Sequence, residues 1–225
     1  MKRAVPGFFL CWVLASTAAL AQEEEGVSYG RGQGWSLLAG DTLGAGRNAF
    51  SAQLGWPGIS LGFLHGGTSR FDIGGKFTFN YGQEGLVEII EPGLKIQGWM
   101  RLMLARTSQA SLALVFQPGP FFYFDDGDTD VGLALPVSFV AGIPVGSAIM
   151  LNLGLDVPFH VYFGAGGGPV FPILVGGGLE YFINRDMEVN FNIRMGPSIF
   201  PDSGPRGRNE AYFTLEALMG VGWRF

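Results

Sequence analysis

Apolar side chains alternate with other side chains through the last fourteen residues of the chain, YFTLEALMGVGWRF. Counted back from Phe225, every second residue is apolar as far as Phe213. Because successive side chains of a β-strand point to opposite faces, this period of two predicts a strand with one wholly apolar face. The predicted strand ends on an aromatic residue, Phe225.

The same period of two recurs in nine further segments along the chain. They cover 47–56, 59–65, 70–81, 93–104, 110–123, 131–143, 148–163, 171–183 and 187–195. Repeated this often, the pattern predicts an all-β domain over residues 46–225 that contains ten strands. Only Pro57 and Gly58 separate the first two segments, and reading these two segments as one strand would lower the count toward eight. A count of twelve is also open.

The connections between these segments alternate in length. Short connections at 66–69, 106–109, 144–147 and 184–186 take turns with mostly longer or more polar ones at 82–92, 125–130, 164–169 and 201–211. This alternation is typical of a single antiparallel up-and-down transmembrane β-barrel, which has its short turns on the periplasmic side. An even number of strands places both ends of the barrel on that side.

The N-terminus has the features of a secretory signal peptide. Lys2 and Arg3 precede an apolar run over 6–20, and a small-x-small site follows at 19–21, which predicts a signal peptide over residues 1–21. Cys11 lies inside it, so the mature chain would contain no cysteine for a disulfide, a metal site or a nucleophile. Residues 22–45 are polar and rich in glycine, and we expect them to form a periplasmic lead-in to the barrel.

The composition limits the partners and the mode of any membrane contact. The chain is 48% hydrophobic and 15% charged and contains 37 glycines, which favours closely packed strands and tight turns over helices. Without Lys2 and Arg3, the 14 basic residues fall to 12 against 19 acidic ones, so nucleic acid is not an expected partner. No later stretch has eighteen successive apolar residues, so a membrane would have to be crossed by strands.

Alternation alone does not decide which face of the barrel points inward. A secreted soluble β-barrel that binds an apolar ligand would bury the apolar row, whereas a membrane barrel would turn it outward. The other row is rich in Gly, Ala, Asn and Thr and poor in charge, which makes it a poor solvent face. Aromatic residues such as Trp56, Tyr81 and Tyr123 stand near segment ends, as interfacial girdles do. We therefore expect the apolar row to face lipid.

The end of the chain resembles the C-terminal assembly signal of bacterial outer-membrane β-barrel proteins. The resemblance lies in Leu218, Gly220, Trp223 and Phe225, although Ala217 stands where a polar residue is expected. It implies a small porin-like protein of the outer membrane of a Gram-negative bacterium. Its implied partners are outer-membrane lipid, lipopolysaccharide, the barrel assembly machinery and small solutes.

The polar row would then line the lumen. It could form a plugged core of ion pairs, or a narrow passive pore in which a basic wall on 70–81 and 93–104 faces an acidic wall on 171–225. Both interpretations describe a structural or transport protein without catalysis, cofactor or metal. The polar residues expected in the lumen are Asp72, Lys76, Lys95, Arg101, Asp156, His160, Glu180, Glu188, Arg194, Glu216 and Arg224.

The alternative is an outer-membrane surface enzyme, a protease or a lipid A-modifying enzyme, that uses Asp156 and His160. An aspartate and a histidine in a ten-stranded barrel resemble the omptin proteases, but the spacing differs from the Asp-x-His of that family. Lipid A deacylases carry a serine two residues after the histidine, where this chain has Tyr162. At about 3.3 Å per residue, Asp156 and His160 would lie roughly 13 Å apart, which is too far for a hydrogen bond. The acidic run over 125–130 lacks the closing glutamate of a calcium loop.

Overall fold

The computed structural model describes residues 34–87, 90–125, 128–164, 167–201 and 209–225. The expected signal peptide over 1–21 and residues 22–33 of the expected lead-in lie outside these ranges. Among the described residues, no helix is long and apolar enough to span a membrane. The elements are β1 (Asn48–Trp56), β2 (Gly58–Gly66), β3 (Phe71–Asn80), the 3₁₀ turn η1 (Gln83–Gly85), β4 (Gly93–Arg106), β5 (Ser111–Phe116), β6 (Gly119–Asp125), β7 (Asp128–Val145), β8 (Ile149–Tyr162), β9 (Gly168–Pro172), β10 (Leu174–Phe182), β11 (Met187–Phe200) and β12 (Glu210–Arg224).

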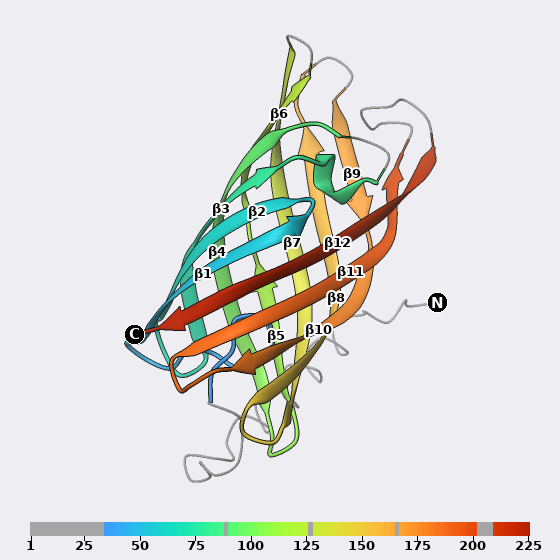
Figure 1. Ribbon diagram of the computed structural model, residues 1–225. Coiled ribbons are helices and arrows are strands. Elements are labelled where there is room, and N and C mark those ends of the chain that lie inside the picture. The colour runs from blue at the N-terminus through green and yellow to red at the C-terminus, as the bar shows by residue number, and fades with distance from the viewer. Residues whose placement is uncertain (1–33, 88–89, 126–127, 165–166, 202–208) are drawn as a thin grey trace, which may run out of the picture.

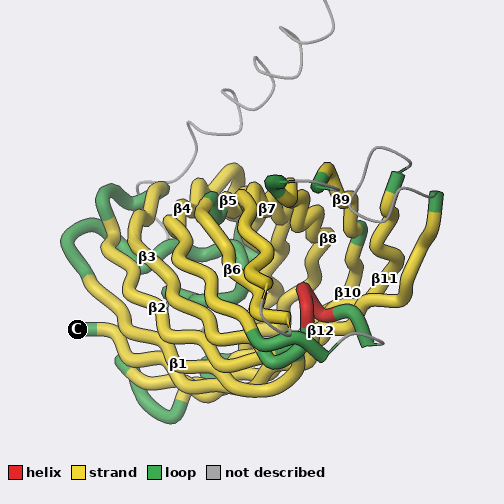
Figure 2. The backbone as a smooth tube through the Cα atoms, turned by 90° about the horizontal axis from the view of Figure 1, so that it is seen from above, coloured by secondary structure: helices red, strands yellow, loops and turns green. Residues whose placement is uncertain are grey.

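These strands form one closed antiparallel barrel (Figures 1 and 2). From β1 to β4, each strand pairs with the next in sequence, as do β7 with β8 and β11 with β12, and β1 pairs with β12 to close the ring, with Phe50 opposite Trp223. β5 and β6 together fill one position between β4 and β7, and β9 and β10 together fill another between β8 and β11. The barrel therefore has ten strand positions, which confirms the sequence prediction of a ten-stranded barrel.

Two of the predicted segments are interrupted rather than continuous. The segment expected over 110–123 breaks at Gln117 and Pro118, where Gly98 N donates to Pro118 O at 2.8 Å. Proline has no N–H for the sheet, so a break at this position is expected. The segment over 171–183 breaks at Ile173, whose N–H donates to Pro197 O at 2.9 Å.

The two ends of the barrel differ in their connections. The turns β2–β3, β4–β5, β7–β8 and β10–β11 lie at the end that carries the C-terminus, at the bottom of Figure 1. We call this the plug end, and we call the opposite end the roof end. The acidic loop expected over 125–130 is shorter than predicted, because Asp125 and Asp128 already pair at the tip of the β6–β7 hairpin.

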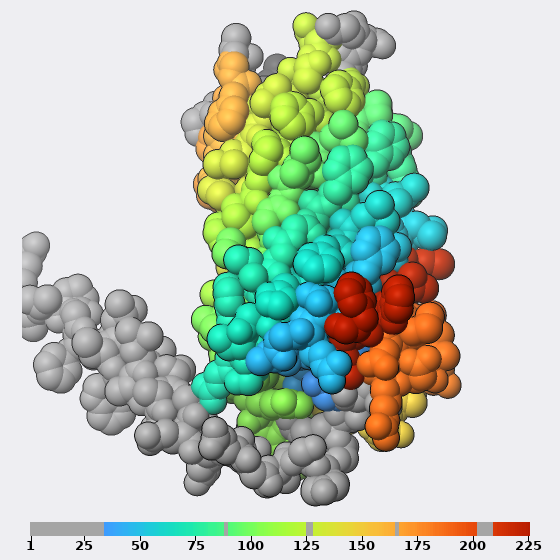
Figure 3. All heavy atoms as spheres, turned by 90° about the vertical axis from the view of Figure 1, so that its left-hand side faces the viewer, coloured from blue at the N-terminus to red at the C-terminus, as the bar shows by residue number. Residues whose placement is uncertain are grey.

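The barrel has an apolar outside and a polar inside. On β11, Met187 and Phe191 on the outward row are each 41% exposed, whereas Glu188 and Arg194 on the inward row are 0% and 2% exposed. Exposed large hydrophobic side chains of the other strands also lie on the outer wall, whereas the inward rows carry the buried charged residues and, near the two ends, apolar clusters. One side of the outer wall is shown in Figure 3. This is the reverse of a soluble barrel, in which the apolar row fills the interior.

Residues 34–43 form a segment, here called the plug, that lies inside the plug end of the barrel. Trp35, Leu37, Ala39 and Leu43 on it are each at most 4% exposed and form one apolar cluster with wall residues such as Trp99. Residues 34–43 of the expected lead-in over 22–45 thus lie inside the barrel, with their apolar side chains buried. Its polar and glycine residues suggested exposure, but its apolar side chains find partners only within the barrel.

Candidate functional site

At the plug end, the side chain of Glu180 on β10 binds backbone N–H groups of the plug. The carboxylate accepts hydrogen bonds from Leu37 N at 2.6 Å and Leu38 N at 2.9 Å, and Ser36 Oγ donates to its other oxygen. Glu180 is fully buried. Because it accepts three hydrogen bonds from three successive plug residues, this carboxyl group is a main anchor of the plug.

A second anchor is the ion pair between Asp72 on β3 and Arg101 on β4, which are neighbours across the two strands. Arg101 Nη2 lies 2.6 Å from Asp72 Oδ2, and both side chains are 0% exposed. Asp72 also accepts from Leu43 N at 3.2 Å. A third anchor is the ion pair between Asp41 of the plug and Arg106 on β4, at 2.9 Å.

Trp35 closes the plug end. Its ring packs edge-on against Phe182 at 5.4 Å and lies under the guanidinium of Arg224 at 5.1 Å, and its Nε1 donates to Arg185 O. Gly222 on β12 leaves space for the neighbouring plug residue Leu37, because a Cβ at position 222 would lie 2.4 Å from Leu37 Cδ1. The wall is therefore shaped to receive the plug.

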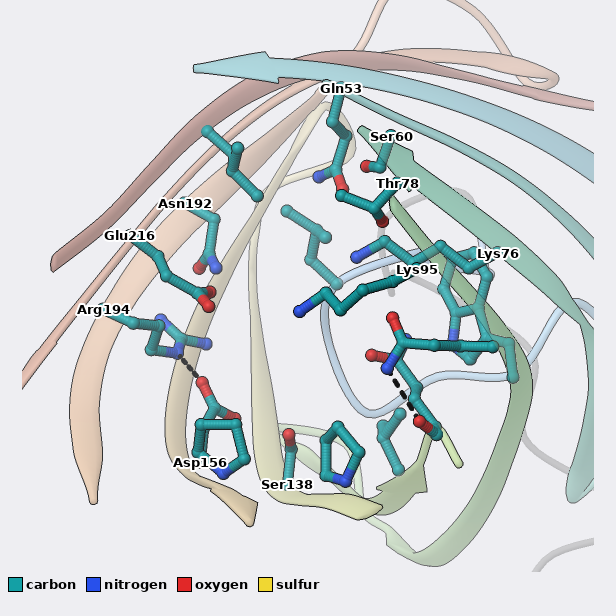
Figure 4. Close-up of a pocket in the computed structure, with 18 of the residues that line it drawn as sticks. Gln53, Ser60, Lys76, Thr78, Lys95, Ser138, Asp156, Asn192, Arg194 and Glu216 are labelled. Atoms are coloured by element: carbon teal, nitrogen blue, oxygen red, sulfur yellow. Dashed lines mark hydrogen bonds and ion pairs between the residues drawn. The ribbon is translucent and has the colours of Figure 1, made fainter. Parts of the chain in front are cut away.

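Above the plug lies a polar chamber of about 160 Å³, shown in Figure 4. Leu37 and Leu38 of the plug form part of its floor. Lys76 on β3 and Lys95 on β4 reach into it from one side. Further residues enter from the opposite side, and these are Asp156 on β8, Arg194 on β11 and Glu216 on β12.

Arg194 is held in place on the chamber wall by two partners. Its Nε lies 2.8 Å from Asp156 Oδ2, and its Nη2 donates to Asn152 Oδ1 at 3.0 Å. The guanidinium lies over Gly154, where a Cβ would approach Arg194 Nη2 to 2.5 Å. A glycine at this inward position of β8 therefore makes the Arg194–Asp156 pair possible.

Glu84 in η1 caps the chamber at the roof end. Its carboxylate pairs with Lys95 Nζ at 2.8 Å and accepts from Tyr123 Oη at 2.6 Å, while its N–H donates to the same Oη. Burial alone would raise the pKa of Glu84, but Lys95, His160 and these hydrogen bonds hold that pKa at about 2. Glu84 therefore stays ionised and bound to the lumen at neutral pH.

Aromatic side chains complete the roof beside Glu84. The ring of His160 packs edge-on against Phe121 at 5.8 Å and lies 5.5 Å from that of Tyr162, and its Nδ1 lies 2.9 Å from Pro158 O. His160 is only 2% exposed. The buried roof cluster consists of Leu86, Phe121, Tyr123, Ala134, Tyr162, Val170 and Phe200.

The eleven lumen residues expected from the sequence fall into three groups along the barrel axis. Asp72, Arg101, Glu180, Glu188 and Arg224 surround the plug, Lys76, Lys95, Asp156, Arg194 and Glu216 line the chamber, and His160 lies in the roof. Asp156 and His160 are not brought together, because Asp156 is bound to Arg194 and His160 is enclosed by aromatic rings.

The residues of the terminal motif occupy both faces of the wall. Trp223 and Phe225 are exposed on the outside, with their rings 5.4 Å apart, whereas Leu218 lines the chamber. Phe225 exchanges two backbone hydrogen bonds with Asn48, at 2.8 and 2.9 Å, and so takes part in closing the barrel.

Sequence reasoning missed Glu84 and the plug. Glu84 stands in a segment expected to be a loop, where no periodicity assigns a direction to its side chain. The alternation of Trp35, Leu37 and Ala39 indicates buried side chains in the plug, but the many polar and glycine residues around them favoured an exposed segment.

No known protein family matches the chain, and no curated protein matches its sequence. Within the part of the chain that the structure describes, no group of three or more His, Cys, Asp or Glu side chains could hold a metal ion.

Proposed function

We propose that this protein is an integral β-barrel of the bacterial outer membrane with a structural or narrow passive transport role and no catalytic activity. The observation that carries the proposal is the inverted polarity of the wall, with apolar side chains outside and charged side chains inside. In water, this outer surface would far exceed the apolar patches of soluble monomers. In a bilayer the same surface is solvated by lipid.

The dimensions of the strands support the proposal. β11 has 14 residues, which at about 3.3 Å per residue gives about 46 Å. With the tilt of about 40° found in such barrels, it would rise by about 35 Å, enough to cross a hydrocarbon core of about 30 Å. The closed ring also leaves no open sheet edge to lipid at these depths.

The filled lumen supports a structural role or narrow passage over a wide pore. The plug occupies one end, and Glu84 with the aromatic cluster occupies the other. The chamber between them is polar, so it does not suit the apolar ligand that the alternative, a secreted soluble β-barrel, would bind. The enzyme alternative would need Asp156 and His160 to act together, and their present partners hold them apart.

The outer membrane of a Gram-negative bacterium is the proposed location because of the terminal motif and the N-terminal signal features. The proposed partners are outer-membrane lipid, lipopolysaccharide and the barrel assembly machinery. Leu218, Gly220, Trp223 and Phe225 would form the signal that this machinery reads.

Cell fractionation tests the location. We expect the mature protein, shortened by 21 residues, in the outer-membrane fraction, released by detergent but not by high salt or alkaline carbonate. On a gel, the unheated sample should migrate as a compact barrel and the boiled sample as an unfolded chain. Recovery of the mature protein in the soluble periplasmic fraction would overturn the proposal.

A further inference from the structure

We propose that the central chamber is a binding site for a small zwitterion that carries one carboxylate and one ammonium group. The inference concerns the interior of the barrel and does not depend on the membrane in which the barrel resides. Its basis is a pair of charged side chains, one of each sign, that make no hydrogen bond and no ion pair within the chamber walls.

Two of the charged groups in the chamber have their own partners. Lys95 is paired with Glu84 at 2.8 Å, and Arg194 is paired with Asp156 at 2.8 Å. These two contacts neutralise four charges within the walls and roof. They leave one cation, Lys76, and one anion, Glu216, that point into the chamber.

Lys76 and Glu216 make no hydrogen bond and no ion pair with any other residue that the structure describes. They lie on opposite sides of the chamber, Lys76 on β3 and Glu216 on β12, and their charges are close enough to interact. A charged group in a protein interior that makes no hydrogen bond and no ion pair is incompletely compensated, even with an opposite charge across the chamber. A ligand whose carboxylate meets Lys76 and whose ammonium meets Glu216 would compensate both at once.

Neutral polar atoms on the same walls are also unsatisfied. Thr78 Oγ1 and Asn192 Oδ1 are buried, line the chamber and have no hydrogen-bond partner. Thr78 stands two residues after Lys76 on β3, and Asn192 stands beside Arg194 on the inward row of β11. Each oxygen is shielded from the open space of the chamber and would meet a ligand only after its side chain turns, with Asn192 Oδ1 then accepting from an ammonium and Thr78 Oγ1 donating to a carboxylate.

The size of the chamber limits the ligand. Its volume of about 160 Å³ is close to that of an engineered protein cavity of about 150 Å³ that holds one benzene molecule. The chamber therefore suits an amino acid of about six to eight heavy atoms, and a peptide or a sugar chain would be too large.

A series of ω-amino acids, from glycine to aminohexanoate, tests the proposal and measures the separation of the two charges. The full-length mature protein is refolded from urea into detergent with each compound present, so that access to the chamber does not limit binding. Binding is measured by calorimetry and by the shift of the thermal transition. We expect one chain length to bind best, and to bind at least about tenfold more tightly than the matching alkyl carboxylate or alkylamine.

Two substitutions locate the binding in the chamber. Lys76→Met and Glu216→Gln should each weaken the binding of the best ω-amino acid by about tenfold or more. Arg224→Gln, outside the chamber, should leave the affinity for that compound unchanged. Equal affinities for the zwitterion and its single-charge analogues would overturn the proposal and leave a chamber filled with water. A loss of binding that is the same in all three variants would also overturn it. Neither result would affect membrane insertion, which fractionation tests separately.

Discussion

Deletion of residues 34–43 should expose the central chamber to water from the plug end. The plug supplies Leu37 and Leu38 to the chamber floor and packs against the wall at that end of the lumen. The readout is a cysteine introduced by Ser138→Cys on the chamber wall. We expect a small water-soluble thiol reagent to modify this cysteine roughly 100-fold faster in the deletion protein than in the intact one, because modification no longer requires the plug to open.

Glu180→Gln gives a milder form of the same experiment, for use if the deletion prevents assembly. This change removes the charge that accepts hydrogen bonds from Leu37 N and Leu38 N but keeps the size of the side chain. Labelling should then lie between the intact and deleted proteins. A cysteine introduced by Asp128→Cys at the exposed start of β7, at the roof end, is the control, and its labelling rate should not change. If Ser138→Cys reacts at one rate in all three proteins, the plug does not close the chamber.

Arg101→Met should destabilise the barrel by about 3–5 kcal/mol, measured by urea unfolding in detergent or lipid vesicles. The change leaves the carboxylate of Asp72 fully buried without its 2.6 Å partner. The remaining hydrogen bonds from Leu43 N, at 3.2 Å, are too weak to replace a guanidinium.

Arg224→Met is the matched control for this measurement. Arg224 pairs with Asp186 at 3.4 Å, and the side chain of Asp186 is 56% exposed, so losing this pair should cost about 1 kcal/mol or less. The double variant Asp72→Asn with Arg101→Met should recover part of the lost stability, because it removes the buried charge as well. Equal losses of unfolding free energy in Arg101→Met and Arg224→Met would show that the buried pair stabilises the barrel no more than the exposed pair does.

The barrel wall could be predicted from the sequence because each strand obeys one local rule. On β11, Met187, Val189 and Phe191 alternate with polar residues, and a single register fixes both faces. Pro57 alone separates β1 from β2, because Gly58 already belongs to β2, and the count is ten and not eight. The interruptions within two strands were not predicted, because Pro118 and Ile173 interrupt the sheet without interrupting the apolar row.

The interior could be predicted only in part. The inward row of each strand follows from alternation, and this assigned residues such as Lys76 and Glu216 to the lumen. Which charges pair across the lumen depends on barrel geometry, so the sequence did not reveal that Arg194 reaches Asp156 from two strands away. The plug and Glu84 belong to segments outside the strands, where no period of two gives the direction of a side chain.

The most direct test of the account is a cysteine scan along β11 from Met187 to Met195 in protein reconstituted into lipid vesicles. Cysteine is absent from the printed sequence after Cys11, so single labels can be introduced into the mature chain without interference. Spin labels at 187, 189, 191, 193 and 195 should be accessible to oxygen dissolved in the bilayer and protected from a water-soluble nickel complex. Labels at 188, 190, 192 and 194 should show low oxygen accessibility. The opposite phase, or nickel access along the row that begins at Met187, would contradict a barrel that faces lipid with its apolar side.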